Sequence, residues 1–426
     1  MATVRPFRPL RYSDPTATAT QIAPPYDVID VALRATLAGS SPHNVVHLDL
    51  PSGDGDAKYA EAQRLLAAWQ AEGVLTRADK PALYTYEQRF KSPVDGSPKR
   101  RAGFFAAVRL EPYDARVILP HERTLSGPKE DRRKLLEATR TALSPGFLLY
   151  RGQGEQARLE DTSELIAEFS TRDGVQHRFA KVTDAATLNA VSTSLQDAQL
   201  LIADGHHRYE TALRYSDLRG EDADAASRYG LFFLVDENDP ELLVLPTHRI
   251  VHGLSGFDAQ DFFTKLAQWF TFTHVEPNEA ADPSALLGKL AAAARPSFVV
   301  QHGDRSVLVS LREEIDPNQL PGERPTALRT LDVVLLHDLV LEQLLGISRE
   351  AQAAKTNLRY MQDASNALEQ ARTGAEGAQL TFVLNATPPR DVRRMAEAGE
   401  VMPQKSTFFF PKVPTGLLFL PLEGAL

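Results

Sequence analysis

The stretch that decides the fold spans residues 200–213 and reads Leu-Leu-Ile-Ala-Asp-Gly-His-His-Arg-Tyr-Glu-Thr-Ala-Leu. Its apolar first part predicts a buried β-strand that stops at an Asp-Gly pair. The part that follows predicts a helix that opens with two histidines and an arginine. The start of a helix offers unpaired backbone N–H groups and a partial positive charge, so it attracts anions. This succession therefore predicts a phosphate site.

Five residues at this junction carry the candidate chemistry. Gly205 lets a ligand approach the backbone closely, and Arg208 can grip a phosphate through two parallel hydrogen bonds. His206 and His207 add donors at the same end of the helix. Asp204 would repel a bare phosphate, so it predicts a site that also holds a metal ion or accepts a proton from a substrate hydroxyl. The alternative is a strand–helix turn whose charges face water; we favour the ligand site.

The composition is typical of an intracellular enzyme. The chain has 426 residues, of which 43% are hydrophobic, enough for two or three domain cores. The net charge of −9 is spread without a long acidic or basic run, which argues against nucleic acid as a partner. The absence of cysteine excludes disulfides and thiolate chemistry and favours the cytoplasm. We expect neither a secretory signal nor a membrane span.

Hydrophobic periodicity predicts an α/β protein with a mixed sheet. Strands are expected at 44–51, 83–90, 102–110, 117–119, 147–150 and 229–236, and helices at 59–69, 127–143 and 184–197. Compact alternation of strands and helices between 242 and 311 predicts a smaller α/β sandwich. We therefore expect a core at 1–240, a small inserted domain at 241–325 and a C-terminal segment at 326–426 that returns to the core.

A second polar cluster follows the apolar strand expected at 117–119. It consists of His121, Glu122, Arg123 and Thr124. Polar residues at strand ends are where α/β folds usually place their sites. Glu122 is a candidate general base for a hydroxyl substrate or a candidate Mg²⁺ ligand. Read alone, the cluster is equally consistent with surface ion pairs.

Two further patterns are weaker. Lys405-Ser406-Thr407 resembles the end of a phosphate loop, but Gln404 stands where that loop needs glycine, so we reject it and keep only Lys405 as a candidate anion contact. His248 and His252 have a spacing known from zinc sites on helices, yet the usual glutamate between them is missing. We expect these histidines to be structural.

The helix start at residues 204–209 resembles the Gly-x-His-Arg segment of the ParB/sulfiredoxin-like nucleotide-binding proteins, most closely the archaeal free-serine kinases. This resemblance implies a ParB/sulfiredoxin-like nucleotide-binding core. It also implies that residues 205–208 hold nucleotide phosphates and that Asp204 lies beside the transferred phosphoryl group. These kinases use a glutamate as base, a role that we assign to Glu122 by hypothesis.

A broader resemblance covers most of the chain. Four segments occur in the order typical of domain-of-unknown-function family 1015: Ala23–Val28, His121–Thr124, Ala203–Tyr209 and Met402–Thr407. The sequence is therefore identified as a member of that family. The resemblance supplies a family without a function.

The resulting prediction is a phosphotransferase that moves a phosphoryl group from ATP or ADP to a small hydroxyl substrate, with free L-serine as a candidate. Mg²⁺ would be shared between phosphate and either Asp204 or Glu122, and the other carboxylate would take the proton. His121, Arg123 and Lys405 are expected as further charge stabilisers. The alternative is a nucleotide-binding switch or slow NTPase that acts through a protein partner. The oligomeric state stays open.

Overall fold

The computed structural model describes residues 1–122, 126–276, 279, 282–322 and 324–426. Contacts divide the chain into two compact units. Unit 1 comprises Met1–Pro120, Thr124–Leu243 and Pro411–Leu426, and unit 2 comprises His121–Arg123 and Val244–Phe410. The second unit thus continues to Phe410 rather than ending near residue 325, because strands from its second half complete its sheet. Only the last 16 residues, Pro411–Leu426, belong with the first unit.

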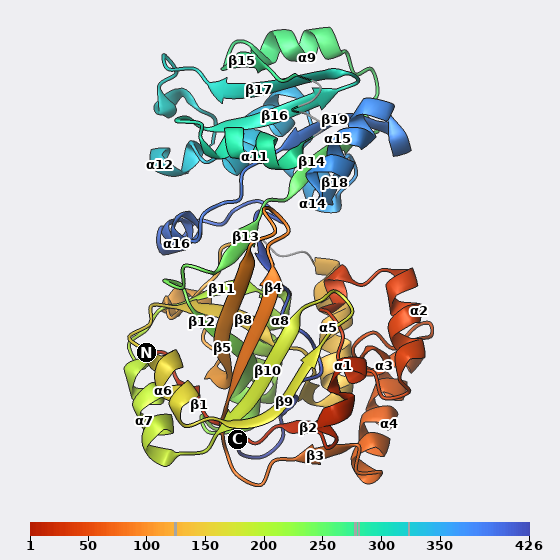
Figure 1. Ribbon diagram of the computed structural model, residues 1–426, viewed down its shortest axis with the longest axis vertical. Helices are drawn as coiled ribbons and strands as arrows, with labels where there is room; N and C mark the ends of the chain where they lie inside the picture. The colour runs from red at the N-terminus through yellow and green to blue at the C-terminus, as the bar shows by residue number, and fades with distance from the viewer. Residues whose placement is uncertain (123–125, 277–278, 280–281, 323) are drawn as a thin grey trace. The chain divides into compact units, whose positions relative to one another are not determined.

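Unit 1 is built on a nine-stranded mixed sheet (Figure 1). Its order is β6-β11-β8-β12-β5-β4-β10-β9, with β1 paired to β5. The strands are β1 (Val4–Arg5), β4 (Leu83–Lys91), β5 (Pro98–Arg109), β6 (Ile118–Leu119), β8 (Gly146–Tyr150), β9 (Glu164–Ser170), β10 (Gln176–Val182), β11 (Leu200–Asp204) and β12 (Tyr229–Asp236). Parallel pairing of β12 with β8 beside antiparallel pairing of β8 with β11 makes the sheet mixed, which confirms the expected α/β class.

Eight described α-helices belong to unit 1, and some of them bury apolar side chains against this sheet. They are α1 (Thr18–Gln21), α2 (Val31–Ser40), α3 (Val46–Asp49), α4 (Ala57–Ala71), α5 (Ser126–Thr139), α6 (Glu155–Asp161), α7 (Ala185–Ser194) and α8 (His206–Arg219). Leu188 and Val191 of α7 and Tyr209 of α8 share one core cluster with Leu148 and Phe232 of the sheet. Short strand pairs β2 (Leu10–Tyr12) with β3 (Leu75–Arg77) and β7 (Thr141–Ala142) with β21 (Leu420–Pro421) complete the unit.

One segment of unit 1 that the sequence predicts as a strand is partly helical. The strand predicted at 44–51 is a loop followed by the short helix α3. The carboxamide oxygen of Asn44 accepts a hydrogen bond from the backbone N–H of Val46 at 2.9 Å, which starts the turn. Val45, Val46 and Leu48 are fully buried, so packing against the core decides in favour of the helix.

Unit 2 contains a six-stranded sheet in the order β15-β17-β16-β19-β14-β18. Its strands are β14 (His248–His252), β15 (Phe270–His274), β16 (Ser297–His302), β17 (Arg305–Leu311), β18 (Leu358–Met361) and β19 (Ala378–Val383). The β19 strand pairs with both β14 and β16, so the sheet joins residues on either side of the expected boundary at 325. His248 and His252 lie on a strand, so the spacing known from zinc sites on helices does not apply to them.

The helices of unit 2 include an uncommon one. Besides α9 (Ala259–Leu266), α11 (Pro283–Ala291), α12 (Thr326–Arg329), α13 (Asp332–Val334), α14 (Arg349–Ala354), α15 (Ala364–Thr373) and α16 (Pro389–Glu397), the segment η6 (Leu335–Leu344) is a π-helix. It covers most of the segment 331–345, whose apolar spacing predicts a helix. The chain passes between the units through β13 (Leu243–Leu245), and β20 (Phe408–Phe410) ends unit 2.

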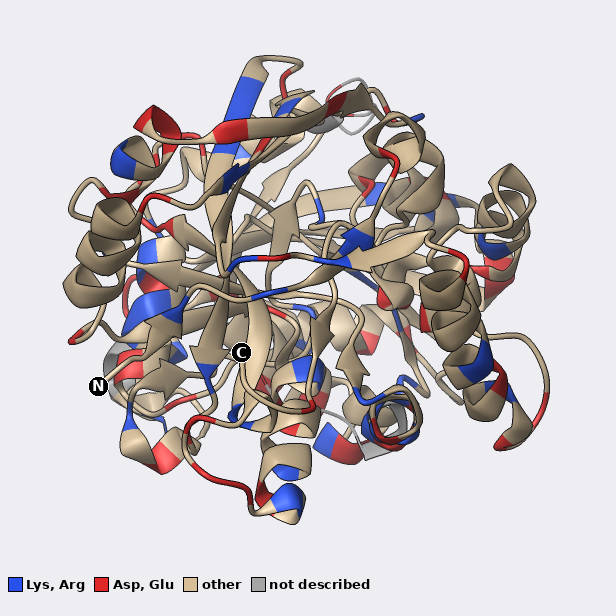
Figure 2. Ribbon diagram, turned by 90° about the horizontal axis from the view of Figure 1, so that it is seen from below, with Lys and Arg blue, Asp and Glu red and all other residues tan. Residues whose placement is uncertain are grey.

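Charged residues of both signs are scattered along the ribbon (Figure 2). Within the described part of the chain, no helix combines the length and the apolar composition needed to cross a bilayer.

Candidate functional site

The strand–turn–helix predicted from residues 200–213 is present in unit 1. The β11 strand ends at Asp204, and α8 begins at His206. Gly205 between them has φ 92°, a left-handed conformation that glycine adopts without a Cβ penalty. A Cβ at this position would lie 2.9 Å from Nε of Arg208. Glycine is therefore required here both by the backbone and by the arginine that folds over it.

The N-terminus of α8 has no side-chain cap. Among the described residues, six other α-helices are capped by Asp or Ser side chains that accept from first-turn amides: Asp30, Asp184, Asp258, Asp282, Ser348 and Asp363. An acidic cap neutralises the positive end of a helix, whereas glycine leaves it without a counter-charge. The α6 helix also starts after a left-handed glycine, Gly154, so the uncapped start of α8 is compatible with an anion site but does not by itself mark one.

Asp204 holds two cationic side chains together. Its Oδ1 accepts a hydrogen bond from Nζ of Lys412 at 2.6 Å, and its Oδ2 accepts one from the guanidinium of Arg208. The side chains of Lys412 and Arg208 are only 13% and 12% exposed. We call Asp204, Arg208 and Lys412 the Asp204 cluster. Sequence reasoning missed Lys412: it chose Lys405, which belongs to unit 2.

Arg208 is fixed by further contacts within unit 1. Its Nη1 donates to Oγ of Ser144 at 3.0 Å and to the carbonyl of Pro145. The guanidinium thus lies between the loop before β8 and the carboxylate of Asp204. A guanidinium that is held in one place loses little entropy when it takes up an anion.

Arg101 of β5 brings a third buried cation to this part of unit 1. It is 1% exposed, and its Nε and Nη1 have no hydrogen-bond partner among the described residues. Its guanidinium lies 5.0 Å from the ring centre of Phe147, and its Nη2 donates to the side chain of Gln88. Burial lowers the pKa of Arg101 to about 10, against the opposing charge of Asp204. An uncompensated buried cation is costly, so it favours an anionic ligand nearby.

Gln88 connects Arg101 to the Asp204 cluster. Its Nε2 donates to the backbone carbonyl of Lys412 at 3.2 Å. The amide thus contacts Arg101 on one side and the residue that reaches Asp204 on the other. Sequence patterns gave no signal for this link, because Gln88 and Arg101 lie in an ordinary strand hairpin.

A small pocket of unit 1 lies against Arg208. It is lined by Tyr26, Asp49, Arg132, Leu135, Leu136, Thr141, Ala142, Leu143, Ser144, Arg208, Thr211 and Ala212. The guanidinium of Arg132 lies 4.4 Å from the ring centre of Tyr26 and donates to Asp49 at 3.0 Å. Burial raises the pKa of Asp49, and Arg132 opposes this shift. Tyr26 belongs to the segment Ala23–Val28, so two of the family's four segments meet at Arg208.

The other two segments meet in unit 2. Nε2 of His121 lies 2.9 Å from Oγ1 of Thr407, and the backbone N–H of Met402 donates to the carbonyl of His121 at 2.8 Å. Glu122 forms a parallel bridge with Met402. Arg123 lies outside the described residues. The structure thus places Glu122, His121 and Lys405 in unit 2 and residues 204–208 in unit 1.

The expected metal role of Asp204 does not fit its surroundings. Each carboxylate oxygen already accepts a hydrogen bond from a cationic side chain, so a metal ion would have to displace Lys412 or Arg208. Among the residues that the structure describes, no group of three or more His, Asp or Glu side chains is placed to hold a metal ion. The cluster offers fixed cations where a metal was expected.

Comparison with known proteins identifies the family. A family model described as "Protein of unknown function (DUF1015)" matches residues 4–334, and the chain belongs to this family. Among solved structures, it is similar to a free serine kinase in complex with AMP, with 14% identity and a TM-score of 0.36 over 76% of this chain and 89% of that chain. No curated protein matches the sequence.

Two more solved structures show similarity of the same kind. A conserved hypothetical protein from Pyrococcus furiosus is 16% identical, with a TM-score of 0.34 over 74% of this chain and 95% of that chain. SbnI with a C-terminal truncation, from Staphylococcus aureus, is 10% identical, with a TM-score of 0.35 over 74% of this chain and 87% of that chain. At such values these similarities concern the fold alone.

Proposed function

We propose that this member of the DUF1015 family binds the phosphates of ATP or ADP in unit 1 and transfers one phosphoryl group to a small hydroxyl compound. Free L-serine is the first acceptor to test. The observation that carries the proposal is the Asp204 cluster at the uncapped start of α8. Phosphoryl transfer requires positioning and charge neutralisation, and this cluster supplies groups for both.

In this proposal the nucleotide phosphates bind at Gly205 and the first turn of α8. The backbone N–H groups of His206 and His207 are part of the positive end of the helix dipole, which favours phosphate. Arg208 and Lys412 then share their charge between Asp204 and phosphate oxygens. Arg101 adds an uncompensated positive charge from the sheet.

The transfer step requires a proton acceptor. The acceptor's hydroxyl oxygen bonds to the terminal phosphorus while the bond from that phosphorus to its bridging oxygen breaks, which leaves ADP from ATP or AMP from ADP. The hydroxyl proton passes to a carboxylate. Asp204 is our candidate for this role, because it lies beside the cations that would hold the phosphate, and Glu122 is the alternative. The roles of His121, Arg123 and Lys405 as charge stabilisers stay predictions from the sequence.

A nucleotide-responsive switch is the second candidate function. It is favoured by one observation: the predicted catalytic Glu122 belongs to unit 2, whereas the proposed phosphate groups belong to unit 1. A switch would bind nucleotide in unit 1, hydrolyse it slowly at most and report to a protein partner. Acceptor-stimulated turnover separates the two candidates.

The test is a phosphoryl-transfer assay with Mg²⁺, ATP or ADP, and L-serine within a panel of small hydroxy compounds. We expect acceptor-dependent product, and a loss of at least tenfold in turnover for Arg208→Ala, roughly 1.4 kcal/mol of transition-state stabilisation. Arg214→Ala, an exposed arginine on the same helix, is the matched control. Nucleotide binding without product would support the switch. Absence of nucleotide binding would contradict both.

A further inference from the structure

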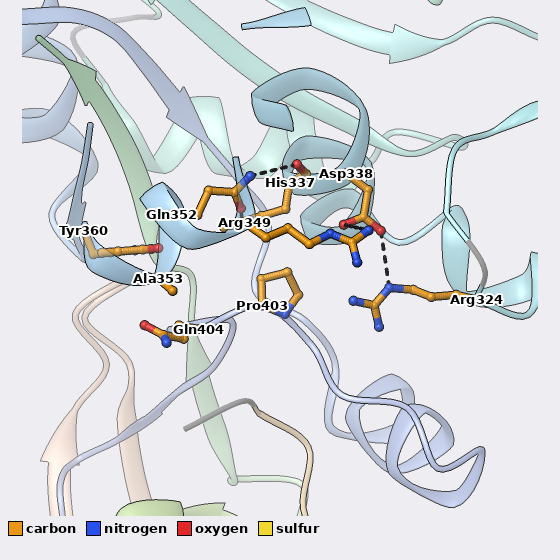
Figure 3. Close-up of a pocket in the computed structure, with 9 residues that line it drawn as sticks. All are labelled: Arg324, His337, Asp338, Arg349, Gln352, Ala353, Tyr360, Pro403 and Gln404. Carbon is orange, nitrogen blue, oxygen red and sulfur yellow. Dashed lines mark hydrogen bonds and ion pairs between the residues drawn. The ribbon is translucent and has the colours of Figure 1, made fainter. Parts of the chain in front are cut away.

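The charged side chains of a pocket in unit 2 are paired with carboxylates (Figure 3). Nε of Arg324 lies 3.3 Å from Oδ2 of Asp338, and its Nη1 lies 3.3 Å from Oε2 of Glu400. Nε of Arg349 lies 3.0 Å from Oε2 of Glu342. In the part of the chain that the structure describes, no buried side-chain nitrogen or oxygen of the lining residues lacks a hydrogen-bond partner. This pocket therefore has no polar group that requires a ligand.

The small pocket of unit 1 that lies against Arg208 differs, because two of its buried polar atoms are unsatisfied. Oδ2 of Asp49 and Oγ1 of Thr211 belong to residues that line it, and neither has a hydrogen-bond partner among the described residues. Asp49 is 4% exposed and Thr211 is 5% exposed. A buried polar atom without a partner destabilises the fold, so these two atoms indicate a ligand that completes their hydrogen bonds.

The two guanidinium groups of this pocket already have oxygen partners. Arg132 donates to the backbone carbonyl and to Oδ1 of Asp49 at 2.8 Å and 3.0 Å, and to Oδ2 of Asp131 at 2.6 Å. Arg208 donates to the carboxylate of Asp204. The groups that lack a partner are thus a carboxylate oxygen and a hydroxyl, not a cation.

Hydroxyl groups are the complement of these two atoms. A carboxylate oxygen accepts hydrogen bonds, whereas a threonine hydroxyl both donates and accepts. Hydroxyl groups of a ligand can donate to Asp49 and accept from Thr211. An ammonium group donates only, and it would add positive charge beside Arg132 and Arg208. An uncharged hydroxyl compound therefore fits this pocket better than an amine.

The rest of the pocket is small and largely apolar. Its volume of about 60 Å³ has room for roughly four or five water-sized groups. Thr211 and Ala212 follow Arg208 by three and four positions, so all three share one face of α8. Leucine and alanine side chains form most of the remaining wall: Leu135, Leu136, Ala142, Leu143 and Ala212. This wall suits a short carbon chain.

We propose that this pocket binds a short, uncharged hydroxyl compound, such as a three-carbon diol. Its hydroxyl groups bond to Asp49 and Thr211, and its carbon atoms contact the leucine side chains. Arg208 belongs both to this pocket and to the Asp204 cluster, so the bound compound is the acceptor in the proposed transfer. That role rests on the function proposed above, whereas the binding itself does not.

The test compares three probes that share one three-carbon frame. Propane-1,2-diol is uncharged, protonated 1-aminopropan-2-ol is a cation and lactate is an anion. Saturation-transfer NMR titrations with the full-length protein give their affinities. We expect the diol to bind about fivefold more tightly than either charged probe. Equal or tighter binding of a charged probe overturns the uncharged class, and no binding of any probe overturns the site.

The variant Thr211→Val localises the binding. It replaces the hydroxyl by a methyl group and removes no hydrogen bond to a described residue, so the Tm should not fall. The affinity for propane-1,2-diol should fall about fivefold, because one hydrogen bond to the ligand is lost. Thr36→Val is the matched control, since the Thr36 hydroxyl lies on α2 and donates to the carbonyl of Ala32 at 3.0 Å. Unchanged diol affinity in Thr211→Val contradicts the proposed contact.

The phosphoryl-transfer assay separates this proposal from the function proposed above. ATP affinity in Thr211→Val is expected to equal that of the wild type. Diol binding without phosphorylated diol would keep the binding site and overturn its role as the acceptor site. Acceptor-dependent product from L-serine in a protein that binds no diol would keep the transfer and overturn this pocket.

Discussion

In each unit one aspartate side chain lies between two cationic side chains, but the contact distances differ. In unit 1 Asp204 is bound tightly by Lys412, at 2.6 Å, and by Arg208. In unit 2 Asp338 is bound loosely, at 3.3 Å by Arg324 and 3.9 Å by Arg349. The two arginines of unit 2 also pair with Glu400 and Glu342, so their charge is divided among three carboxylates, whereas Asp204 is bound closely by both of its cations.

The backbone around Asp204 accounts for one of its two contacts. The turn at Gly205 folds Arg208 back over its own strand end, so that residues 204 and 208 meet within one helical turn. The other contact comes from Lys412, which lies 208 positions away and is brought to Asp204 by long-range packing. In unit 2 Arg324 precedes η6 in the sequence and Arg349 follows it, so neither lies one helical turn from Asp338.

Among the substitutions considered, neutralising the two carboxylates is expected to change the free energy of unfolding most. Asp204→Asn leaves two mostly buried cations without their counter-charge, and we expect the free energy of unfolding to fall by about 3 kcal/mol. Asp338→Asn removes longer contacts, and its two arginines keep Glu400 and Glu342 as partners, so a smaller loss of about 1.5 kcal/mol is expected. Urea denaturation measures both values. Equal losses would mean that the difference in contact lengths has no energetic counterpart.

Acid is expected to destabilise unit 2 through His337, a buried histidine of η6. Burial lowers the pKa of His337 to about 3, while in an unfolded chain it is about 6.5. The unfolded state therefore takes up a proton that the folded state does not, and stability is lost as pH falls below about 6.5. At about pH 5 this amounts to roughly 2 kcal/mol.

Denaturation of wild type and His337→Asn at both pH values tests this expectation. The variant should lose roughly 2 kcal/mol less than the wild type between about pH 7 and pH 5. His274→Asn is the control, because this histidine is 64% exposed. The same pH dependence in His337→Asn and the wild type would show that the buried imidazole does not govern the effect.

Alanine substitutions at Gly205 and Gly220 distinguish a specific effect of the turn before α8 from the general cost of a left-handed alanine. Gly205→Ala forces a Cβ into a left-handed position and against Arg208, and we expect a loss of about 1.5 kcal/mol in stability together with weaker nucleotide binding. Gly220→Ala at the other end of α8 is the control. Its φ is 60°, but nothing lies within 4 Å of the added Cβ. Weaker nucleotide binding in both variants would contradict a specific role for the turn.

The smallest effect is expected at Arg101. Arg101→Met removes a buried charge that has two N–H groups without partners, so stability should stay unchanged or rise by about 1 kcal/mol. Nucleotide affinity should fall about threefold, as a positive charge near Asp204 is lost. Thermal unfolding and calorimetric titration report the two quantities. A large loss of stability would show that the guanidinium is structural.

The sequence predicted those strands and turns whose residue pattern is recognisable within a short segment. Alternation and apolar runs located β4, β5, β8 and β12 to within a few residues, and the Asp-Gly pair located the turn before α8. The expected strand at 44–51 failed, because Val45, Val46 and Leu48 suit a short buried helix equally well. Four residues are too few for periodicity to decide.

Among the site residues, too, those with a local sequence signal were predicted and those without one were not. Asp204 and Arg208 are four positions apart and were found together. Lys412 lies 208 positions from its partner, and no spacing rule connects them. The preference for Lys405 followed a resemblance to a phosphate loop, whereas the strand after it carries Lys412 back to unit 1. The π-helix was missed because its apolar pattern is also that of an α-helix.

The most direct test of the central claim is calorimetric titration of ATP and ADP into the wild type and Lys412→Met. The account predicts that the wild type binds nucleotide and that Lys412→Met binds at least tenfold more weakly. Lys181→Met, a half-exposed lysine of the same unit, should behave as the wild type. Equal affinity in Lys412→Met and the wild type, or no binding by the wild type, would contradict a nucleotide site at the Asp204 cluster.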